Sequence, residues 1–264
     1  MLPSRSRLER WNPDSLTSAG QAVTDSGGAV DEAVAAVSTN IATMPDTRAW
    51  SGDAHSAATS MFERAAKQTS AFSAYTAAVG QALTLGAGTI GAARTPLLDK
   101  AFDLDMGGEL HVSDQWVVLI TGAQLTAEQT AALERRAQAE QAAVNRLLLA
   151  VGAADDETAA AVTGAAQPFG FEVLNPAGLG SLLLPGSQNP GDEVPNPSTS
   201  MGLLQQATIR DADMAQTIRD TKVEKQFNPD TGEEVATTTT LFMQDGSRHV
   251  RTVNAEPHFR TEDR

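Results

Sequence analysis

Residues 48–55 read RAWSGDAH and separate two long alanine-rich segments of the chain. Tryptophan occurs only three times among the 264 residues, so Trp50 is conspicuous beside Ser51 and Gly52. Glycine adopts backbone conformations that other residues avoid, and a serine or aspartate side chain can cap the helix that follows. The stretch therefore predicts a turn at Trp50, Ser51 and Gly52, with Ser51 or Asp53 capping the next helix. On a simpler interpretation, Trp50 only fills the bend as a hydrophobic plug.

The segment before this turn carries one apolar stripe with alternating spacings of four and three residues. Its members are Leu16, Gly20, Val23, Gly27, Val30, Val34, Val37, Ile41 and Met44. This spacing is typical of a helix whose stripe repeats about every 3.5 residues. Pro13 and Asp14 suit the start of that helix, and Pro45 suits its end.

The segment after the turn repeats the same alternation. Its stripe comprises Ala58, Phe62, Ala65, Thr69, Phe72, Thr76, Val79 and Leu83, with Gly86, Ile90 and Ala93 as an extension. The second helix is predicted to end before Pro96. Because the connection is short, the two helices are expected to run antiparallel. A lone hairpin has little to bury both stripes, so a partner is expected to cover them. The expected partner-binding seam is Val23, Val30, Val37, Phe62, Phe72, Val79 and Leu83.

A W-x-G triplet between two helices of this pattern, in a chain without cysteine, resembles the WxG family of small type VII secretion substrates. These are the early-secreted-antigen-like proteins of actinobacteria and their relatives. The resemblance covers roughly residues 10–96 and is carried by Trp50, Gly52 and the two stripes. It implies a helical hairpin that pairs with a second hairpin in a four-helix bundle. It also implies export through an ATPase-driven secretion machine, from the cytoplasm to the medium or cell envelope, without a signal peptide.

The chain departs from that family at the secretion signal. Many members carry Tyr-x-x-x-Asp/Glu after the second helix, whereas the single tyrosine here, Tyr75, is followed four residues later by Val79. Two interpretations stay open. Either the partner hairpin supplies the signal, or the domain has kept the fold and left the pathway.

A third helix predicted over residues 126–151 offers an internal alternative to a partner. It opens with a capping box formed by Thr126 and Gln129, and it is expected to stop at Gly152, before a shorter helix that ends at Thr163. Its stripe is Leu133, Ala137, Glu140, Val144, Leu147 and Val151. Docked on the hairpin, this helix would give a self-contained bundle. Between residues 100 and 122, the run WVVLI predicts a short buried strand or extended staple, with Trp116 in the core.

The sequence from residue 165 onward predicts a different local structure. Proline, glycine, asparagine and serine dominate residues 165–202, which favours a linker. A helix is expected next, bearing Leu203, Leu204, Ala207, Ile209, Met214 and Ile218. The segments TKVEKQF, EEVATTTTLFM and RHVRTVN, joined by the turns NPDTG and QDGS, predict a three-stranded antiparallel meander. Its expected inward residues are Val223, Phe227, Val235, Leu241 and Met243.

The predicted fold class is therefore mainly α, with an N-terminal antiparallel hairpin or bundle, additional helices, a linker and a small C-terminal β meander. The expected division is residues 1–98 for the hairpin and 99–164 for an extended segment with helices that pack on it. Residues 165–202 form the linker, 203–254 the helix and meander, and 255–264 an unstructured tail.

Composition argues against several classes of function. The formal charge is −14, without a basic stripe, so nucleic-acid binding is not expected. Cysteine is absent, which removes disulfides and thiolate chemistry. The basic start MLPSRSRLERW is followed by polar residues, which argues against a cleaved signal peptide. The charge-free window from Gln68 to Ala93 is long enough to span a bilayer, but Ser, Thr and Gly dilute it too far for insertion.

The sequence predicts neither cofactor nor metal. GAGTIG at residues 86–91 matches G-x-G-x-x-G, but a dinucleotide site needs a strand before the glycines and this segment follows a helix. His55, His111, His249 and His258 do not share ligand spacing. We therefore expect a non-enzymatic protein that contacts another helical hairpin, or itself, and the secretion machinery, with no small-molecule substrate. The alternative is a secreted effector, toxin or enzyme whose active part is the C-terminal region.

Overall fold

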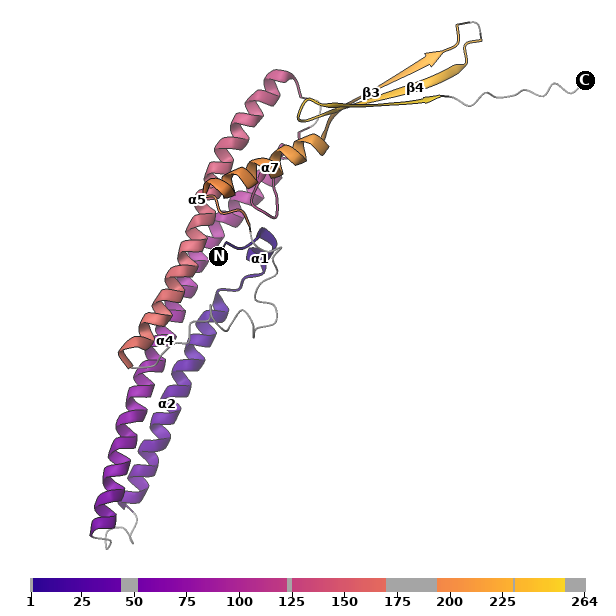
Figure 1. Cartoon of the computed structure of the whole chain (residues 1–264). Helices are drawn as coiled ribbons and strands as arrows, with labels where there is room; N and C mark the ends of the chain where they lie inside the picture. The colour runs from indigo at the N-terminus through magenta and orange to yellow at the C-terminus, as the bar shows by residue number, and fades with distance from the viewer. Residues whose placement is uncertain (1, 44–51, 123–124, 170–193, 230, 255–264) are drawn as a thin grey trace, which may run out of the picture. The chain divides into compact units, whose positions relative to one another are not determined.

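The structure is a computed structural model that describes residues 2–43, 52–122, 125–169, 194–229 and 231–254. It is mainly helical, with long N-terminal helices and a C-terminal three-stranded antiparallel sheet, as predicted (Figure 1). In chain order the elements are α1 (Arg5–Arg10), α2 (Asp14–Thr43), α4 (Asp53–Met106), β1 (Leu110–Val112), β2 (Val118–Ile120), α5 (Ala127–Ala166), η1 (Gln167–Phe169), α7 (Ser200–Gln216), β3 (Ile218–Phe227), β4 (Glu234–Met243) and β5 (Arg248–Asn254).

The chain divides into two compact units. The first comprises Arg7–Pro96 and Leu149–Glu193, and the second comprises Leu2–Ser6, Leu97–Leu148 and Val194–Arg264. Helices α4 and α5 each contribute residues to both units, because the divisions fall inside them.

In the first unit, α2 and α4 form the predicted antiparallel hairpin and lie side by side (Figure 1). Glycines bring the two backbones close together. A Cβ atom built on Gly20 would lie 2.5 Å from the carbonyl oxygen of Gly80, and one built on Gly27 would lie 1.7 Å from Thr76 Oγ1. Further along, the Asp31 carboxylate accepts a 2.8 Å hydrogen bond from Thr69. Partners in α4 therefore descend in number as those in α2 rise, which defines an antiparallel pair.

Two predicted helix ends are wrong. Helix α4 continues through Pro96 to Met106, and α5 continues through Gly152 to Ala166 as one helix. A proline removes only one helical hydrogen bond, and the burial of Leu97, Ala101 and Leu104 just beyond it favours continued helix. Helix α5 likewise continues through Gly152, because this residue is buried in the packed helix. The residues from 44 to 51, which include the end predicted at Pro45, lie outside the described ranges.

The start and the buried face of α5 are as predicted. The backbone N–H of Gln129 donates to Thr126 Oγ1 over 3.2 Å, and the Gln129 side chain accepts from the Thr126 N–H over 2.8 Å. This reciprocal pair is the expected capping box. All six stripe positions are buried or half-buried: Leu133, Ala137, Val144 and Val151 are less than 10 % exposed, and Glu140 and Leu147 are half-buried.

The second unit has its core beneath the hairpin of β1 and β2. Leu110 pairs with Ile120 and Val112 with Val118, and all four side chains are buried. Trp116 lies in the connection between the strands with φ 61°, a left-handed conformation that is uncommon for a bulky residue. Its side chain is 0 % exposed, and its indole N–H donates to the carbonyl of Pro3 over 2.8 Å. The prediction that Trp116 is a core residue is confirmed.

Helix α7 packs in the second unit through polar side chains. Gln206, which is 2 % exposed, exchanges two hydrogen bonds with Asn145 of α5, at 3.0 and 2.9 Å. Arg210 donates to the Gln141 side chain, and Gln141 in turn bonds the backbone of Val118 and Trp116. Of the apolar residues on which the helix was predicted, Leu203 and Leu204 are 49 and 60 % exposed, whereas Ala207, Ile209 and Met214 are half-buried. Ile218 was predicted on this helix but is the first residue of β3. The helix was predicted from its pattern, but the face by which it packs was not.

This packing leads to a test with a matched pair of glutamines. Replacing the buried Gln206 with alanine leaves the side-chain NH2 group of the half-buried Asn145 without its acceptor, although Asn145 Oδ1 still accepts from Gln141, so the free energy of unfolding is expected to fall by about 1–3 kcal/mol. Replacing the adjacent exposed Gln205 with alanine is expected to change it by less than about 0.5 kcal/mol. Urea denaturation followed by circular dichroism measures both. Equal midpoints for the two variants would contradict the docking of α7 through Gln206.

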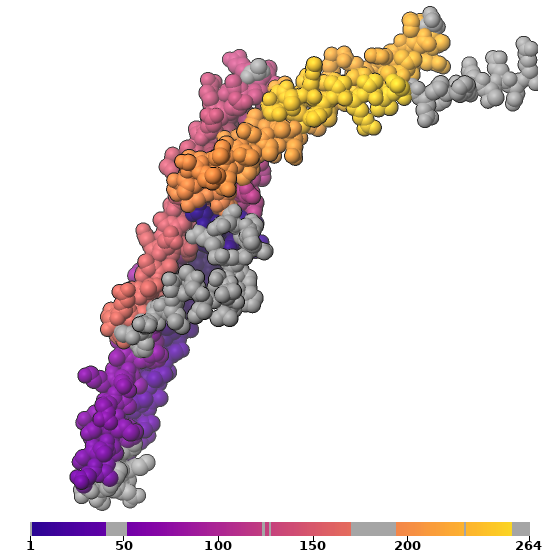
Figure 2. All heavy atoms as spheres, viewed as in Figure 1, coloured from indigo at the N-terminus to yellow at the C-terminus, as the bar shows by residue number. Residues whose placement is uncertain are grey.

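The C-terminal meander has the predicted order β3-β4-β5, with positive φ at Gly232 and Gly246 in its two turns. Its predicted inward face is partly wrong. Val223, Phe227 and Val235 are 55, 57 and 43 % exposed, whereas Met243 is buried. Helix α7 contacts the sheet at the end of β4, where the Gln244 N–H donates to the carbonyl of Thr217, the residue after α7, and the Asp245 N–H donates to the Met214 carbonyl. In the space-filling view, no helix lies over the visible face of the outer strands (Figure 2).

Candidate functional site

The turn motif is described only in part. Trp50 and Ser51 lie outside the described residues, whereas Gly52 has φ 111°, a region that favours glycine. Asp53 is the first residue of α4, and the Gly52 carbonyl accepts from the N–H of Ser56 over 3.1 Å. The special backbone conformation predicted for Gly52 is therefore confirmed, and the role of the indole stays a prediction.

The seven predicted seam residues differ in exposure. Val23, Phe62, Phe72, Val79 and Leu83 are half-buried, while Val30 is 43 % and Val37 is 49 % exposed. Along α2 the less exposed positions are Gly20, Gly27, Asp31, Val34 and Ser38. After Gly27 the contact face therefore includes Asp31 and Ser38 in place of the predicted Val30 and Val37, while Val34 stays on it.

The drift has a geometric cause. A straight α-helix has 3.6 residues per turn, so a strict seven-residue repeat rotates around it by about 20° per heptad. The predicted stripe in α2 runs for several heptads, and at its far end Val30 and Val37 have turned away from α4. These two valines are consequently available to another molecule rather than to the hairpin itself.

The part of the hairpin nearest the turn has the least cover. Within the described residues, Tyr75 of α4 contacts Phe169 of η1, with ring centroids 5.8 Å apart. In Figure 1, α5 does not extend along the first part of α4, next to the turn, which lies beside α2. Met61 in this section is 56 % exposed. A two-helix section with exposed Val30, Val37 and Met61 forms what we call the open hairpin surface.

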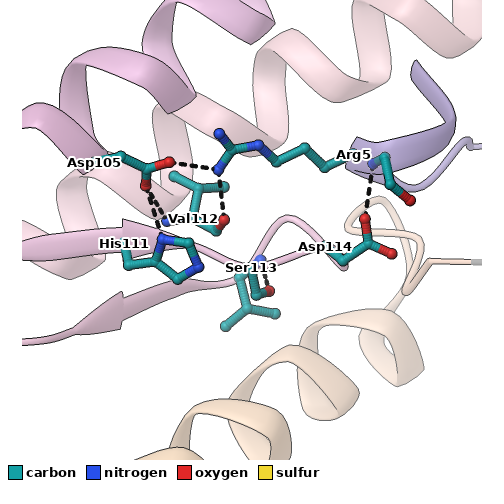
Figure 3. Close-up of polar contacts among 8 residues, drawn as sticks. Arg5, Asp105, His111, Val112, Ser113 and Asp114 are labelled. Carbon is teal, nitrogen blue, oxygen red and sulfur yellow. Dashed lines mark hydrogen bonds and ion pairs between the residues drawn. The ribbon is translucent and has the colours of Figure 1, made fainter. Parts of the chain in front are cut away.

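A second group of polar contacts lies in the second unit (Figure 3). The Arg5 guanidinium pairs with the Asp105 carboxylate at 2.8 Å and donates to the Val112 carbonyl at 2.7 Å. Asp105 also accepts from the Val112 N–H at 2.9 Å and contacts His111 Nδ1 at 3.0 Å. The neighbouring Asp114 accepts from the backbone N–H groups of Arg5 and Ser6. Sequence reasoning missed this group, because Arg5 is about a hundred residues distant in the chain from its partners.

The arrangement fastens residues 3–6 to the β1–β2 hairpin. Asp105 orients His111 as a carboxylate orients a catalytic imidazole, but among the residues that the structure describes no side-chain hydroxyl is hydrogen-bonded to this imidazole. The contacts around Arg5 therefore support a structural clasp rather than a reaction centre.

The clasp gives the stability a defined dependence on pH. Burial by itself raises the pKa of Asp105, but the hydrogen bond from Val112 and the Arg5 guanidinium outweigh it and lower the pKa. A lowered native pKa stabilises the fold above the unfolded pKa of about 4, and this contribution disappears as the pH falls through the native value. Asp105→Asn is expected to cost about 1–3 kcal/mol at neutral pH, and the difference from the wild type should shrink below about pH 4. Urea midpoints at pH 7, 5, 4 and 3 measure it.

Asp103→Asn is the control, since Asp103 is exposed two residues earlier in α4. A pH-independent difference between the wild type and Asp105→Asn, or an equal loss for Asp103→Asn, would contradict the ion pair with Arg5.

The other sequence motifs form no site. GAGTIG does not follow a helix but lies inside α4, where a Cβ on Gly86 would lie 2.2 Å from Thr158 Cγ2, so the glycine allows a close contact between α4 and α5. In the part of the chain that the structure describes, no cluster of three or more His, Asp or Glu side chains is suited to bind a metal. His258 lies outside the described residues. Of the helices within the described ranges, none has the length and apolarity needed to cross a bilayer.

Comparisons with sequence models of protein families, with curated proteins and with solved structures find no match.

Proposed function

We propose that the chain acts without catalysis, as a type VII secretion substrate or secretion-associated protein that recognises another helical hairpin. The observation that carries this proposal is the open hairpin surface of Val30, Val37 and Met61 on a long antiparallel pair with only two helices. A hairpin of this kind gains stability when a second pair of helices covers its apolar residues. The W-x-G triplet at the turn supports the same assignment by resemblance.

The alternative to a partner is a self-contained bundle, in which α5 covers the hairpin, and the contact between α5 and α4 limits how much of the hairpin is covered in this way. Thr158 of α5 packs against Gly86 of α4, so part of the hairpin is covered within the chain. In Figure 1 this cover ends before the first part of α4, next to the turn. A partner hairpin is therefore expected to pair with the section near the turn, beyond the reach of α5.

The pairing can be tested with the full chain, expressed with an affinity tag in an actinobacterial host that has an active type VII system. We expect a second W-x-G hairpin protein to co-purify in equal amount, and the double variant Val30→Glu with Val37→Glu to lose it. The matched control is Ala29→Glu with Ala36→Glu, which adds the same charge one position earlier on exposed sites of α2. If neither a hairpin protein nor a second copy of the chain binds, the proposal fails.

Export needs a separate measurement. The chain is expected in the culture filtrate when the secretion ATPase is active and inside the cells when it is disrupted. Detection only inside the cells in both cases would contradict export but not hairpin pairing.

A further inference from the structure

A pocket of about 430 Å³ lies in the first unit, beside the connection from α1 to α2. Its apolar wall includes Trp11, Pro13, Leu16 and Ile90, and two charged residues, Arg10 and Asp155, complete it. Ile90 is 5 % exposed and forms the most buried part of the lining, whereas Trp11 and Leu16 are half-buried. The pocket is large enough to hold a small organic molecule.

The two charged residues of the lining differ in burial, because Arg10 is exposed and Asp155 is half-buried. Within the described ranges, no residue forms a hydrogen bond or ion pair with the side chain of Arg10 or Asp155, and the two do not pair with each other. Asp155 is half-buried, and its burial raises the pKa of the carboxyl group; the positive charge of the chain's α-amino group opposes the rise, Asp156 adds to it and Arg7 opposes it. A partly buried carboxylate without a donor has lost water contacts that no protein group has replaced. An incoming cationic group would replace them.

A ligand with a single charge would pair with only one of the two charged residues in the lining. An ammonium suits Asp155, a carboxylate suits the guanidinium of Arg10, and an apolar body suits Trp11 and Ile90. A singly charged ligand would leave one of the two protein charges unmatched. We propose that this pocket binds a small zwitterion, with an ammonium group at Asp155, a carboxylate at Arg10 and an apolar side chain against Trp11, Leu16 and Ile90. This chemistry is that of an apolar amino acid or of a short apolar peptide.

The first test uses the unmodified full chain and isothermal titration calorimetry. Leucine and leucyl-leucine are the zwitterionic probes, and the tighter of the two distinguishes a free amino acid from a peptide. N-acetylleucine lacks the ammonium, leucinamide lacks the carboxylate and glycine lacks the apolar body. Each is expected to bind at least about tenfold more weakly than leucine or leucyl-leucine, since each loses one charged or apolar contact.

Substitutions then assign each end of the ligand. Asp155→Asn is expected to weaken binding of the zwitterion at least about tenfold while leaving N-acetylleucine unchanged, because that probe has no ammonium. Arg10→Gln should weaken the zwitterion similarly and leave leucinamide unchanged. Asp156→Asn removes the adjacent carboxylate, which does not line the pocket, and is expected to bind like the wild type. Circular dichroism confirms that each variant is folded.

The inference is overturned if neither leucine nor leucyl-leucine binds at about 10 mM, a concentration that would detect even weak association. Equal binding of all five probes, or equal losses for Asp155→Asn and Asp156→Asn, would also overturn it.

Discussion

Trp116→Ala is expected to lower the free energy of unfolding by about 3–5 kcal/mol, which is the usual cost of removing a fully buried aromatic side chain. The indole is 0 % exposed and packs in the second unit, whose core includes Val117 and Val118. Its N–H is bonded to the Pro3 carbonyl, so the substitution also removes the donor for that oxygen. Alanine would in addition have to keep the left-handed φ of 61° without the packing that holds tryptophan there.

Urea denaturation of the full chain, followed by circular dichroism, measures this loss. Phe102→Ala is the control, because Phe102 is in the same unit but 60 % exposed, and it is expected to change stability by less than about 0.5 kcal/mol. Trp116→Phe should fall between the two, since phenylalanine restores an aromatic ring but not the donor. Similar midpoints for Trp116→Ala and Phe102→Ala would show that Trp116 is not a core residue.

The second large effect is expected at the crossing of α2 and α4. In Gly20→Ala the new methyl group would lie 2.5 Å from the carbonyl oxygen of Gly80, an approach that real Cβ atoms do not make. A backbone atom cannot change rotamer, so the two helices must separate. Overpacking of this kind typically costs 1–3 kcal/mol, and this exceeds the gain of about 1 kcal/mol from the better helix propensity of alanine.

Gly28→Ala, on the same helix, is expected to change the stability in the opposite direction. A Cβ atom there meets nothing within 4 Å, so only the propensity gain applies and the variant is expected to be more stable than the wild type. The propensity gain is common to both variants, so thermal denaturation should separate them by the overpacking cost alone, about 1–3 kcal/mol. Gly20→Ala with wild-type stability would rule out a close approach of the two backbones.

Local patterns were sufficient for much of the fold. The spacing of apolar residues predicted the long helices, and the pair Thr126 and Gln129 predicted the start of α5 from two side chains three residues apart. Turn residues Gly232 and Gly246 predicted both turns of the meander. Each of these features is determined by residues close together in the sequence, so each can be read without knowledge of the tertiary structure.

Features that depend on distant residues were missed. The bond from Arg5 to Asp105 and the pairing of Gln206 with Asn145 join segments far apart in the chain, and no periodicity indicates them. The exposure of Val30 and Val37 depends on a rotation that accumulates over several turns, which a seven-residue repeat does not represent. The opposed charges of Arg10 and Asp155 came to line one pocket through the same kind of long-range approach.

The uninterrupted course of α4 has a practical consequence for recombinant fragments. A hairpin fragment that stopped at residue 98, where the sequence suggested a boundary, would cut α4 within its length and create a new C-terminus beside Leu97. That leucine is completely shielded in the intact chain, and the cut would separate it from Ala101 and Leu104, which share its shielded position in α4. The apolar end of the helix would be frayed and exposed in such a fragment. Aggregation through this end would then be mistaken for binding to a specific partner. Truncations that retain α4 through Met106 avoid that artefact.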